Sequence, residues 1–127
     1  MELINGLYTV ESALSTEEGF DYLIRFNPSH FIYAAHFPGE PITPGVCILQ
    51  ACIELLEISL SSRLSVECVK NVKFLKVITP TETSQVYYRF RSLKQSEDVV
   101  SAQCTVATDE ETFAKISLVC RRQTGQN

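Results

Sequence analysis

The sequence contains no apolar run close to the ~18–20 residues needed to span a bilayer, and it has no excess of positive charge. Eleven Lys and Arg against 15 Asp and Glu leave a net charge of -4, which argues against nucleic-acid binding through overall positive charge. The first residues have neither the basic start nor the apolar stretch of a secretion signal. We therefore expect a cytoplasmic chain that binds neither membranes nor nucleic acid.

The five cysteines include no CxxC pair, and their odd number is typical of free thiols in a reducing compartment. Four of them lie among apolar neighbours and are expected to act as small core residues. Cys47 lies near a predicted helix start, where a thiolate can be stabilised, but no base stands beside it, so a structural role is favoured. His30, His36 and Cys47 match no zinc spacing, so we expect no metal and no other cofactor.

A chain of 127 residues with 45% apolar and 20% charged residues predicts a single globular domain over 1–127. Alternation of apolar residues and turn signals predict the order of elements. These are strands over 7–11 and 20–26, a helix over 44–60, and strands over 66–78, 84–92, 99–108 and 112–121. The order predicts an α+β fold in which a curved antiparallel sheet wraps around one central buried helix.

The predicted helix is apolar on almost every side, which is typical of a helix buried on almost every side. Thr43 is expected to cap its N-terminus and Pro44 to be its first residue. A polar stripe formed by Gln50, Glu54 and Glu57 breaks the apolar surface. Because one sheet cannot cover all sides of a helix, we expect a second chain to complete the burial as a dimer.

One segment, HFPGEPITPGVCILQA over residues 36–51, carries the residues suited to catalysis. It places His36 in a loop stiffened by prolines that leads into the start of the helix. The N–H of Gly45 lies in the first helical turn, where backbone donors have no partner and the helix dipole is positive. A base beside such a donor is suited to removing a proton next to a carbonyl group.

This segment resembles the HFPxxPxxPGVLxxEAxAQ signature of the hotdog-fold 3-hydroxyacyl-acyl-carrier-protein dehydratases of the FabZ and FabA type. The stretches NPSHF over 27–31 and VKFLKVITP over 72–80 also fit the pattern of that family. The resemblance covers most of the chain. It implies a hotdog fold, an enzyme of the hydro-lyase class, and a role in the biosynthesis of fatty acids or related acyl chains.

The resemblance also implies roles for particular residues. His36 would be the base that removes the α-proton of a 3-hydroxyacyl thioester, and the N–H of Gly45 would hold the thioester oxygen. Phe37, Pro44 and Val46 would contact the substrate. The resemblance further implies an acyl-carrier-protein-bound thioester as the substrate, and a homodimer or higher oligomer whose sites combine residues of two subunits.

The sequence departs from the family at the acid. The family has Glu or Asp fourteen residues after the histidine, where this chain has Gln50, and the usual Gln one turn later is replaced by Glu54. An amide cannot protonate the departing hydroxyl, and loss of a general acid costs about 10²–10⁴-fold in rate. Three hypotheses follow. Glu54 replaces the acid, the chain is a weak or inactive subunit, or the site catalyses a related reaction such as isomerisation.

We favour the first hypothesis, because a carboxylate in a buried helix is costly without a partner or a task. A Gln50–Glu54 hydrogen bond that only stabilises the structure has nearly equal weight. The function classes that remain are an acyl-thioester dehydratase and a non-catalytic subunit that forms a heterodimer with an active dehydratase. An acyl thioesterase is a weaker alternative.

Overall fold

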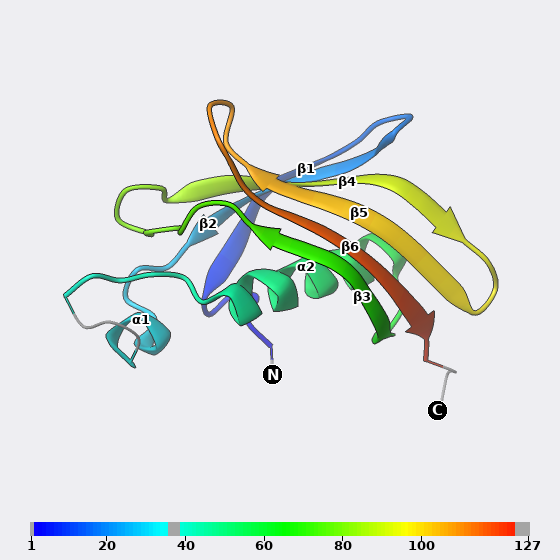
Figure 1. The fold of residues 1–127 in the computed structure, drawn as a ribbon, viewed down its shortest axis with the longest axis horizontal. Helices are drawn as coiled ribbons and strands as arrows, with labels where there is room; N and C mark the ends of the chain where they lie inside the picture. The colour runs from blue at the N-terminus through cyan, green and yellow to red at the C-terminus, as the bar shows by residue number, and fades with distance from the viewer. Residues whose placement is uncertain (1, 36–38, 124–127) are drawn as a thin grey trace.

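The computed structural model describes residues 2–35 and 39–123, which form one six-stranded antiparallel sheet curled around a long helix (Figure 1). The strand order is β1-β2-β4-β5-β6-β3, so β1 and β3 are the two edges. The strands are β1 (Tyr8–Ser15), β2 (Gly19–Phe26), β3 (Leu64–Phe74), β4 (Gln85–Gln95), β5 (Val99–Ala107) and β6 (Thr112–Arg122), and the helices are α1 (Phe31–Ala35) and α2 (Gly45–Leu60). The expected α+β arrangement is confirmed.

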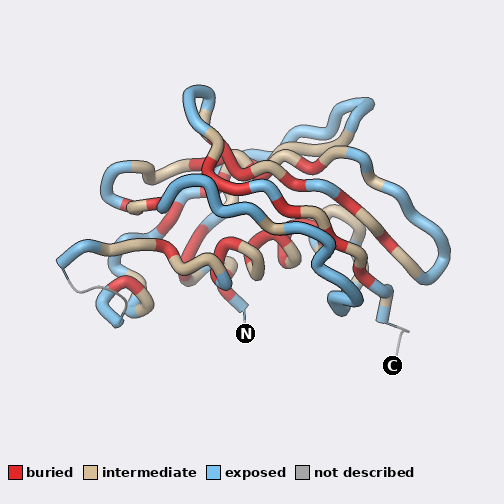
Figure 2. The backbone as a smooth tube through the Cα atoms, viewed as in Figure 1, coloured by how far each residue is buried: buried red, intermediate tan, exposed pale blue. Residues whose placement is uncertain are grey.

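The core lies between α2 and the concave face of the sheet, where the red segments of Figure 2 face each other. Alternate residues of each central strand point toward the helix, such as Val86, Tyr88 and Phe90 in β4, which are fully buried. Tyr88 also donates a hydrogen bond from its hydroxyl to the carbonyl oxygen of Ile48 at 3.0 Å. Period-two alternation in the strands thus supplies one apolar face that the helix covers.

The N-terminus of α2 differs from the prediction. Pro44 occupies the N-cap position with no side-chain hydrogen bond to the helix, so Thr43 is not the cap. The hydroxyl of Thr43 instead pairs with that of Tyr33 at 2.9 Å, in the core. Pro44 can precede the helix in extended conformation because its carbonyl oxygen still accepts the first helical bonds, from the amides of Cys47 and Ile48.

Several predicted boundaries were also wrong. β1 continues to Ser15 although most of its side chains are exposed. Pairing of its backbone with β2 holds this part of the strand, not an alternation of apolar and polar residues. The short helix α1 lies in a segment predicted to be loop, and is held by its buried Tyr33. β3 ends at Phe74 rather than at residue 78. Directly after Phe74, the amides of Leu75 and Lys76 both donate to the carbonyl oxygen of Phe113.

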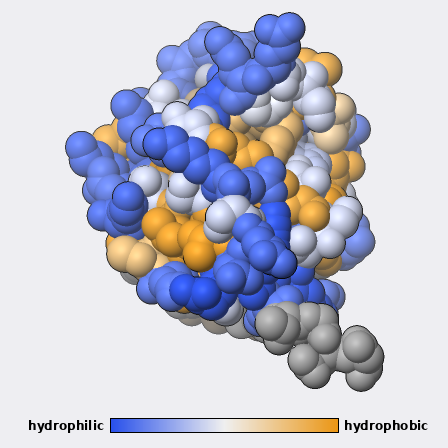
Figure 3. All heavy atoms as spheres, turned by 90° about the vertical axis from the view of Figure 1, so that its right-hand side faces the viewer, coloured by the Kyte–Doolittle hydropathy of each residue, from blue (hydrophilic) through white to orange (hydrophobic). Residues whose placement is uncertain are grey.

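The burial of α2 is incomplete within one chain. Its sheet-facing side is buried as predicted, whereas Val46 is 73% and Ile58 47% exposed. Strand β3 is exposed on nearly its whole length and adds the apolar side chains of Val66 and Val69 to the surface. At the end of the molecule shown in Figure 3, hydrophobic surface lies between hydrophilic side chains. Within residues 2–35 and 39–123, none of the helices has the length and hydropathy needed to cross a membrane.

The cysteines do not divide as predicted. Cys68 on β3 is exposed, whereas Cys47, Cys52, Cys104 and Cys120 are buried. Burial raises the pKa of Cys47, which argues against a stabilised thiolate at the helix start and agrees with a structural role. Sequence reasoning misjudged Cys68 because a β-rich apolar context does not reveal that a strand is at the edge of a sheet.

Candidate active site

Of the residues expected to act on substrate, those that the structure describes lie in α2 or directly before it: Pro44, Gly45, Val46, Gln50 and Glu54. His36 and Phe37 lie outside the described residues. Pro44 is half-buried and Val46 projects into solvent. Gly45 is the first residue of the helix, and none of the described residues accepts a hydrogen bond from its N–H. Within the described residues the backbone donor at the helix start is therefore unpaired, as an oxyanion site requires.

Gly45 is in direct contact with the ring of Phe74 at the end of β3. A Cβ atom at position 45 would lie 2.8 Å from the ring's Cζ, which is closer than real contacts allow. Phe74 is itself 50% exposed, so the other side of its ring is open. Glycine at this position thus has a packing reason in addition to any contact between its N–H and a ligand.

A mostly apolar cavity of about 400 Å³ opens beside this contact. Its walls come from the segment before α2, the first turns of the helix and the segment after β3. The lining residues are Ile42, Thr43, Pro44, Gly45, Ile48, Phe74, Leu75, Lys76 and Val77. An apolar pocket next to a free N–H suits an acyl chain attached to a polar carbonyl group.

Gln50 and Glu54 face a different cavity, of about 450 Å³, which Glu57 and Arg63 also line. Gly45 and Gln50 are five residues apart, about 140° around the helix axis and about 7.5 Å along it. The two residues therefore open on different sides of α2. In the described part of the chain, the predicted oxyanion donor at Gly45 and the predicted acid position at Gln50 therefore line separate cavities.

The carboxylate of Glu54 is buried and accepts four hydrogen bonds. Its Oε2 accepts from the backbone N–H of Leu3 at 2.7 Å and from Nε2 of Gln50 at 3.1 Å. Its Oε1 accepts from the backbone N–H of Ile4 at 3.0 Å and from the hydroxyl of Tyr8 at 2.8 Å. A carboxylate has about four lone-pair positions, so these donors occupy its accepting capacity.

These contacts tie the N-terminal segment to the middle of α2. Burial, followed by the hydrogen bond to Glu54, raises the pKa of Tyr8 well above its ordinary value, so Tyr8 stays a donor at all physiological pH. Glu57 has a comparable local task, accepting the backbone N–H of Leu64 at 2.8 Å. The polar stripe on the helix therefore secures backbone groups that would otherwise be unpaired.

Sequence reasoning did not identify Leu3, Ile4 and Tyr8 as the partners of Glu54, nor Phe74 as the neighbour of Gly45. The partners are 46 to 51 residues apart in sequence, so no local pattern could reveal them. His30 is a loop residue whose Nδ1 accepts a hydrogen bond from the N–H of Ile32 at 3.1 Å.

Comparison with known proteins agrees with this architecture. The model of the ApeI-like family, described as ApeI dehydratase, matches residues 12–115. The chain is 29% identical over 107 residues to the 3-hydroxyacyl-[acyl-carrier-protein] dehydratase FabZ of Wolbachia pipientis subsp. Culex pipiens (strain wPip), which covers 79% of this chain and 72% of the relative.

Two solved structures share the fold. The dehydratase heterocomplex ApeI:P from Xenorhabdus doucetiae has a TM-score of 0.70 at 14% identity, covering 89% of this chain and 96% of that one. A hypothetical thioesterase protein with coenzyme A from Streptococcus pneumoniae TIGR4 has a TM-score of 0.63 at 10% identity, covering 94% of this chain and 88% of that one.

The curved antiparallel sheet around one central helix is therefore a hotdog fold, as expected. Because the family model spans most of the chain, the protein belongs to the ApeI-like dehydratase family. The resemblance to FabZ-type dehydratases is confirmed by these findings. The roles of individual residues in catalysis stay predictions.

Proposed function

We propose that the chain is one half of a two-chain dehydratase acting on 3-hydroxyacyl thioesters of acyl carrier protein. It supplies the base and the oxyanion donor, and a partner dehydratase chain supplies the acid. His36 removes the α-proton, and the N–H of Gly45 stabilises the negative charge on the thioester oxygen. The partner's carboxylic acid protonates the 3-hydroxyl, which leaves as water while the trans-2 double bond forms.

The observation that carries this proposal is the occupied carboxylate of Glu54 beside the amide of Gln50. Glu54 already accepts four hydrogen bonds from its own chain, so each lone pair that could carry a proton for donation to the substrate hydroxyl already faces a donor. If Glu54 were protonated, its O–H would face one of the four groups that donate to it and would find no acceptor there. This geometry weighs against Glu54 as the replacement acid. The helix then has no acid either at position 50, which is Gln, or at position 54.

The exposed edge of the sheet supports assembly with a second chain. Within the described part of the chain no strand pairs with the outer side of β3, and an exposed edge strand of this length is a template for pairing. Its neighbours Leu75 and Val77 are 50% and 64% exposed, so apolar surface extends from β3 to the Gly45 cavity. A partner on this edge would cover that surface. The Xenorhabdus doucetiae neighbour is a dehydratase heterocomplex, which fits a mixed pair.

A complementation experiment tests the proposal within this one chain. Wild-type protein carries His36 and lacks an acid at position 50, and the double variant His36→Ala/Gln50→Glu carries the acid and lacks the base. Each is assayed alone, and then both after joint refolding, by the absorbance of a conjugated 2-enoyl thioester. Random pairing of equal amounts makes half the dimers mixed, with about a quarter of all sites complete.

We expect each protein alone to be inactive, and the mixture to reach about a quarter of the activity of the single variant Gln50→Glu. An active wild type would overturn the proposal. In that case Glu54→Gln identifies the acid: loss of turnover with unchanged folding would assign it to Glu54. Release of free thiol without a change in enoyl absorbance would indicate a thioesterase instead.

A further inference from the structure

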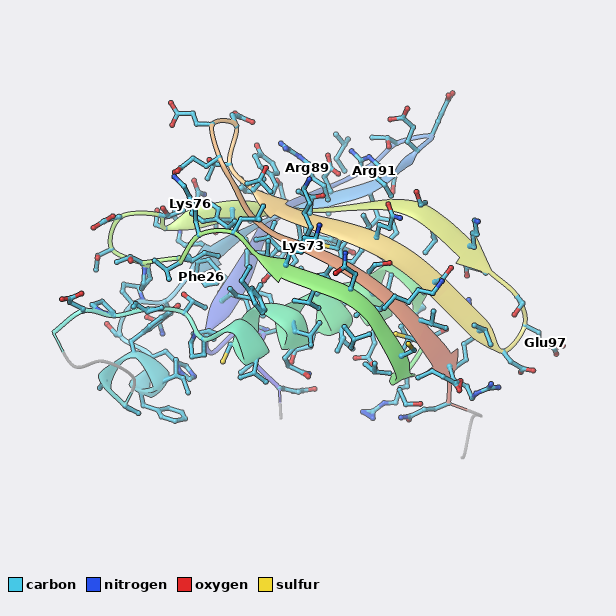
Figure 4. The ribbon with its side chains drawn as sticks, in the orientation of Figure 1. Phe26, Lys73, Lys76, Arg89, Arg91 and Glu97 are labelled. Atoms are coloured by element: carbon cyan, nitrogen blue, oxygen red, sulfur yellow. The ribbon has the colours of Figure 1, made fainter. Side chains whose placement is uncertain are left out.

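The convex face of the sheet, opposite α2, concentrates positive charge. Two cross-strand rows run over it: Lys73, Lys115, Thr105 and Arg89, then Asn71, Ser117, Gln103 and Arg91, in β3, β6, β5 and β4. In Figure 4 Arg89 and Arg91 lie above the sheet, on the side away from α2. The adjoining inward row of Val72, Ile116, Cys104 and Phe90 faces the helix, which fixes the orientation of the charged rows. A chain of net charge -4 thus has one distinctly basic face.

Lys73 and Lys115 are directly opposite each other on paired strands. Like charges in this arrangement destabilise a sheet. Neither lysine has an acidic partner among the described residues, whereas Arg91 pairs with Asp21 at 2.7 Å and Lys76 with Glu111. The described part of the chain thus leaves these two facing cations available to an anion from outside the chain.

The same face is hollowed. A cavity of about 310 Å³ is lined by Lys115, Asn71 and Thr105, and also by the buried Cys104 and Ile116. A smaller one of about 110 Å³ is lined by Lys70 and Lys94, and also by the buried Ala102 and Leu118. Both cavities share Gln103 and Ser117, so they form one trough across β6. Among the described residues, no carboxylate and none of the exposed large hydrophobic side chains lines the trough. Its chemistry is that of a receptor for carboxylates.

We infer that this trough is a docking surface for an acidic protein segment, whose carboxylates lie against Lys70, Lys94 and Lys115 in the trough and against Lys73, which is opposite Lys115. The inference is independent of the proposed reaction, since the convex face is separated from both α2 cavities by the sheet. β3 carries Lys70 and Lys73 at the free edge, so the trough reaches the edge at which a second chain would pair.

The surroundings favour an acidic protein over a nucleic acid or a membrane. Asp21 borders the basic rows on β2, and Asp109 and Glu111 border them at the β5–β6 turn. These carboxylates and the net negative charge would repel a long polyanion that extends beyond the trough. A short acidic segment confined to the trough does not reach them. The described lining of the trough also lacks the exposed apolar side chains that insert into lipid.

The test measures binding of a fluorescently labelled hexaglutamate peptide by anisotropy at low ionic strength. The informative variant is Lys115→Glu, and the matched control is Arg63→Glu, which makes the same charge change beside the Gln50 cavity. We expect Lys115→Glu to weaken binding by about 10-fold and Arg63→Glu by less than about 2-fold, since screened charges act locally. Equal effects of the two variants would overturn the inference.

A second variant separates a docking role from a general charge effect. Lys115→Thr removes the like charge that faces Lys73, so it is expected to raise the midpoint temperature of thermal unfolding. The same variant is expected to weaken binding of the peptide by about 5-fold. Unchanged binding by Lys115→Thr would overturn the inference. Tighter binding of single-stranded RNA or of anionic vesicles than of the peptide would also overturn it, by assigning the face to a different partner.

Discussion

The side chains of Gln50 and Glu54 are joined by a hydrogen bond of 3.1 Å across one turn of α2. This bond directs the amide at position 50, where the resemblance to FabZ-type dehydratases predicts an acid, to a structural carboxylate. The exchange of Gln and Glu along the helix is therefore more than a swap of equivalent groups. It puts the charge at position 54 instead of position 50, and there the carboxylate binds the backbone N–H groups of Leu3 and Ile4.

Replacing Glu54 by Ala is expected to destabilise the protein by about 3–5 kcal/mol, because it leaves several buried donors without an acceptor. Glu57→Ala removes the acceptor of a single backbone N–H on the same helix and should cost about 1 kcal/mol. Urea unfolding followed by circular dichroism measures both. Equal losses would show that the four contacts of Glu54 contribute no more than one.

Gly45→Ala is expected to cost about 1–2 kcal/mol, because the added methyl group overlaps the ring of Phe74. Phe74→Ala should relieve that cost, so the double variant will be more stable than the sum of the single changes predicts. A double-mutant cycle by urea unfolding gives the coupling. Additive effects would mean that the ring moves aside without cost.

Aspartate at Val69, on the exposed edge of β3, is expected to prevent pairing with a second chain by placing charge on that edge. Light scattering during size-exclusion chromatography should then show the mass of one chain instead of two. Leu14→Asp is the matched control, because Leu14 is 62% exposed on β1, at the opposite edge. A dimer that persists in Val69→Asp but dissociates in Leu14→Asp would place the interface on β1.

Stability is expected to fall between pH 10 and about 12 through Tyr33. Burial raises the pKa of Tyr33 to about 12, so the folded state keeps a proton that the unfolded state releases from about pH 10. The unfolded state then binds fewer protons, and rising pH favours it. Tyr33→Phe should make this fall shallower in urea titrations at several pH values.

Thr43→Val is the control for that measurement. It removes the same hydrogen bond, at a cost of about 1 kcal/mol, but keeps the phenol. The alkaline fall should therefore persist in Thr43→Val. An identical alkaline fall in wild type and Tyr33→Phe would assign it to other groups.

Much of the fold could be predicted from local patterns. Alternation identified β2, β5 and β6 within a residue or two, and the apolar run after residue 44 identified α2, because each pattern reflects burial of one face. The extent of β1 and β3 could not be predicted, since edge strands are held by backbone pairing with little burial. The cap at Thr43 was mistaken because Tyr33, ten residues away, binds its hydroxyl.

The sequence by itself determined the family, the segment that bears His36 and Gly45, and the absence of an acid at position 50, because these are properties of residue identity and spacing. Only the tertiary structure decided what Glu54 does, since its donors Leu3, Ile4 and Tyr8 reach it through folding of a distant segment. Tertiary structure likewise formed the two separate cavities that Gly45 and Gln50 line, and it placed Lys73 opposite Lys115. Hydrogen bonding and strand register act between residues far apart in the chain, and no local pattern encodes them.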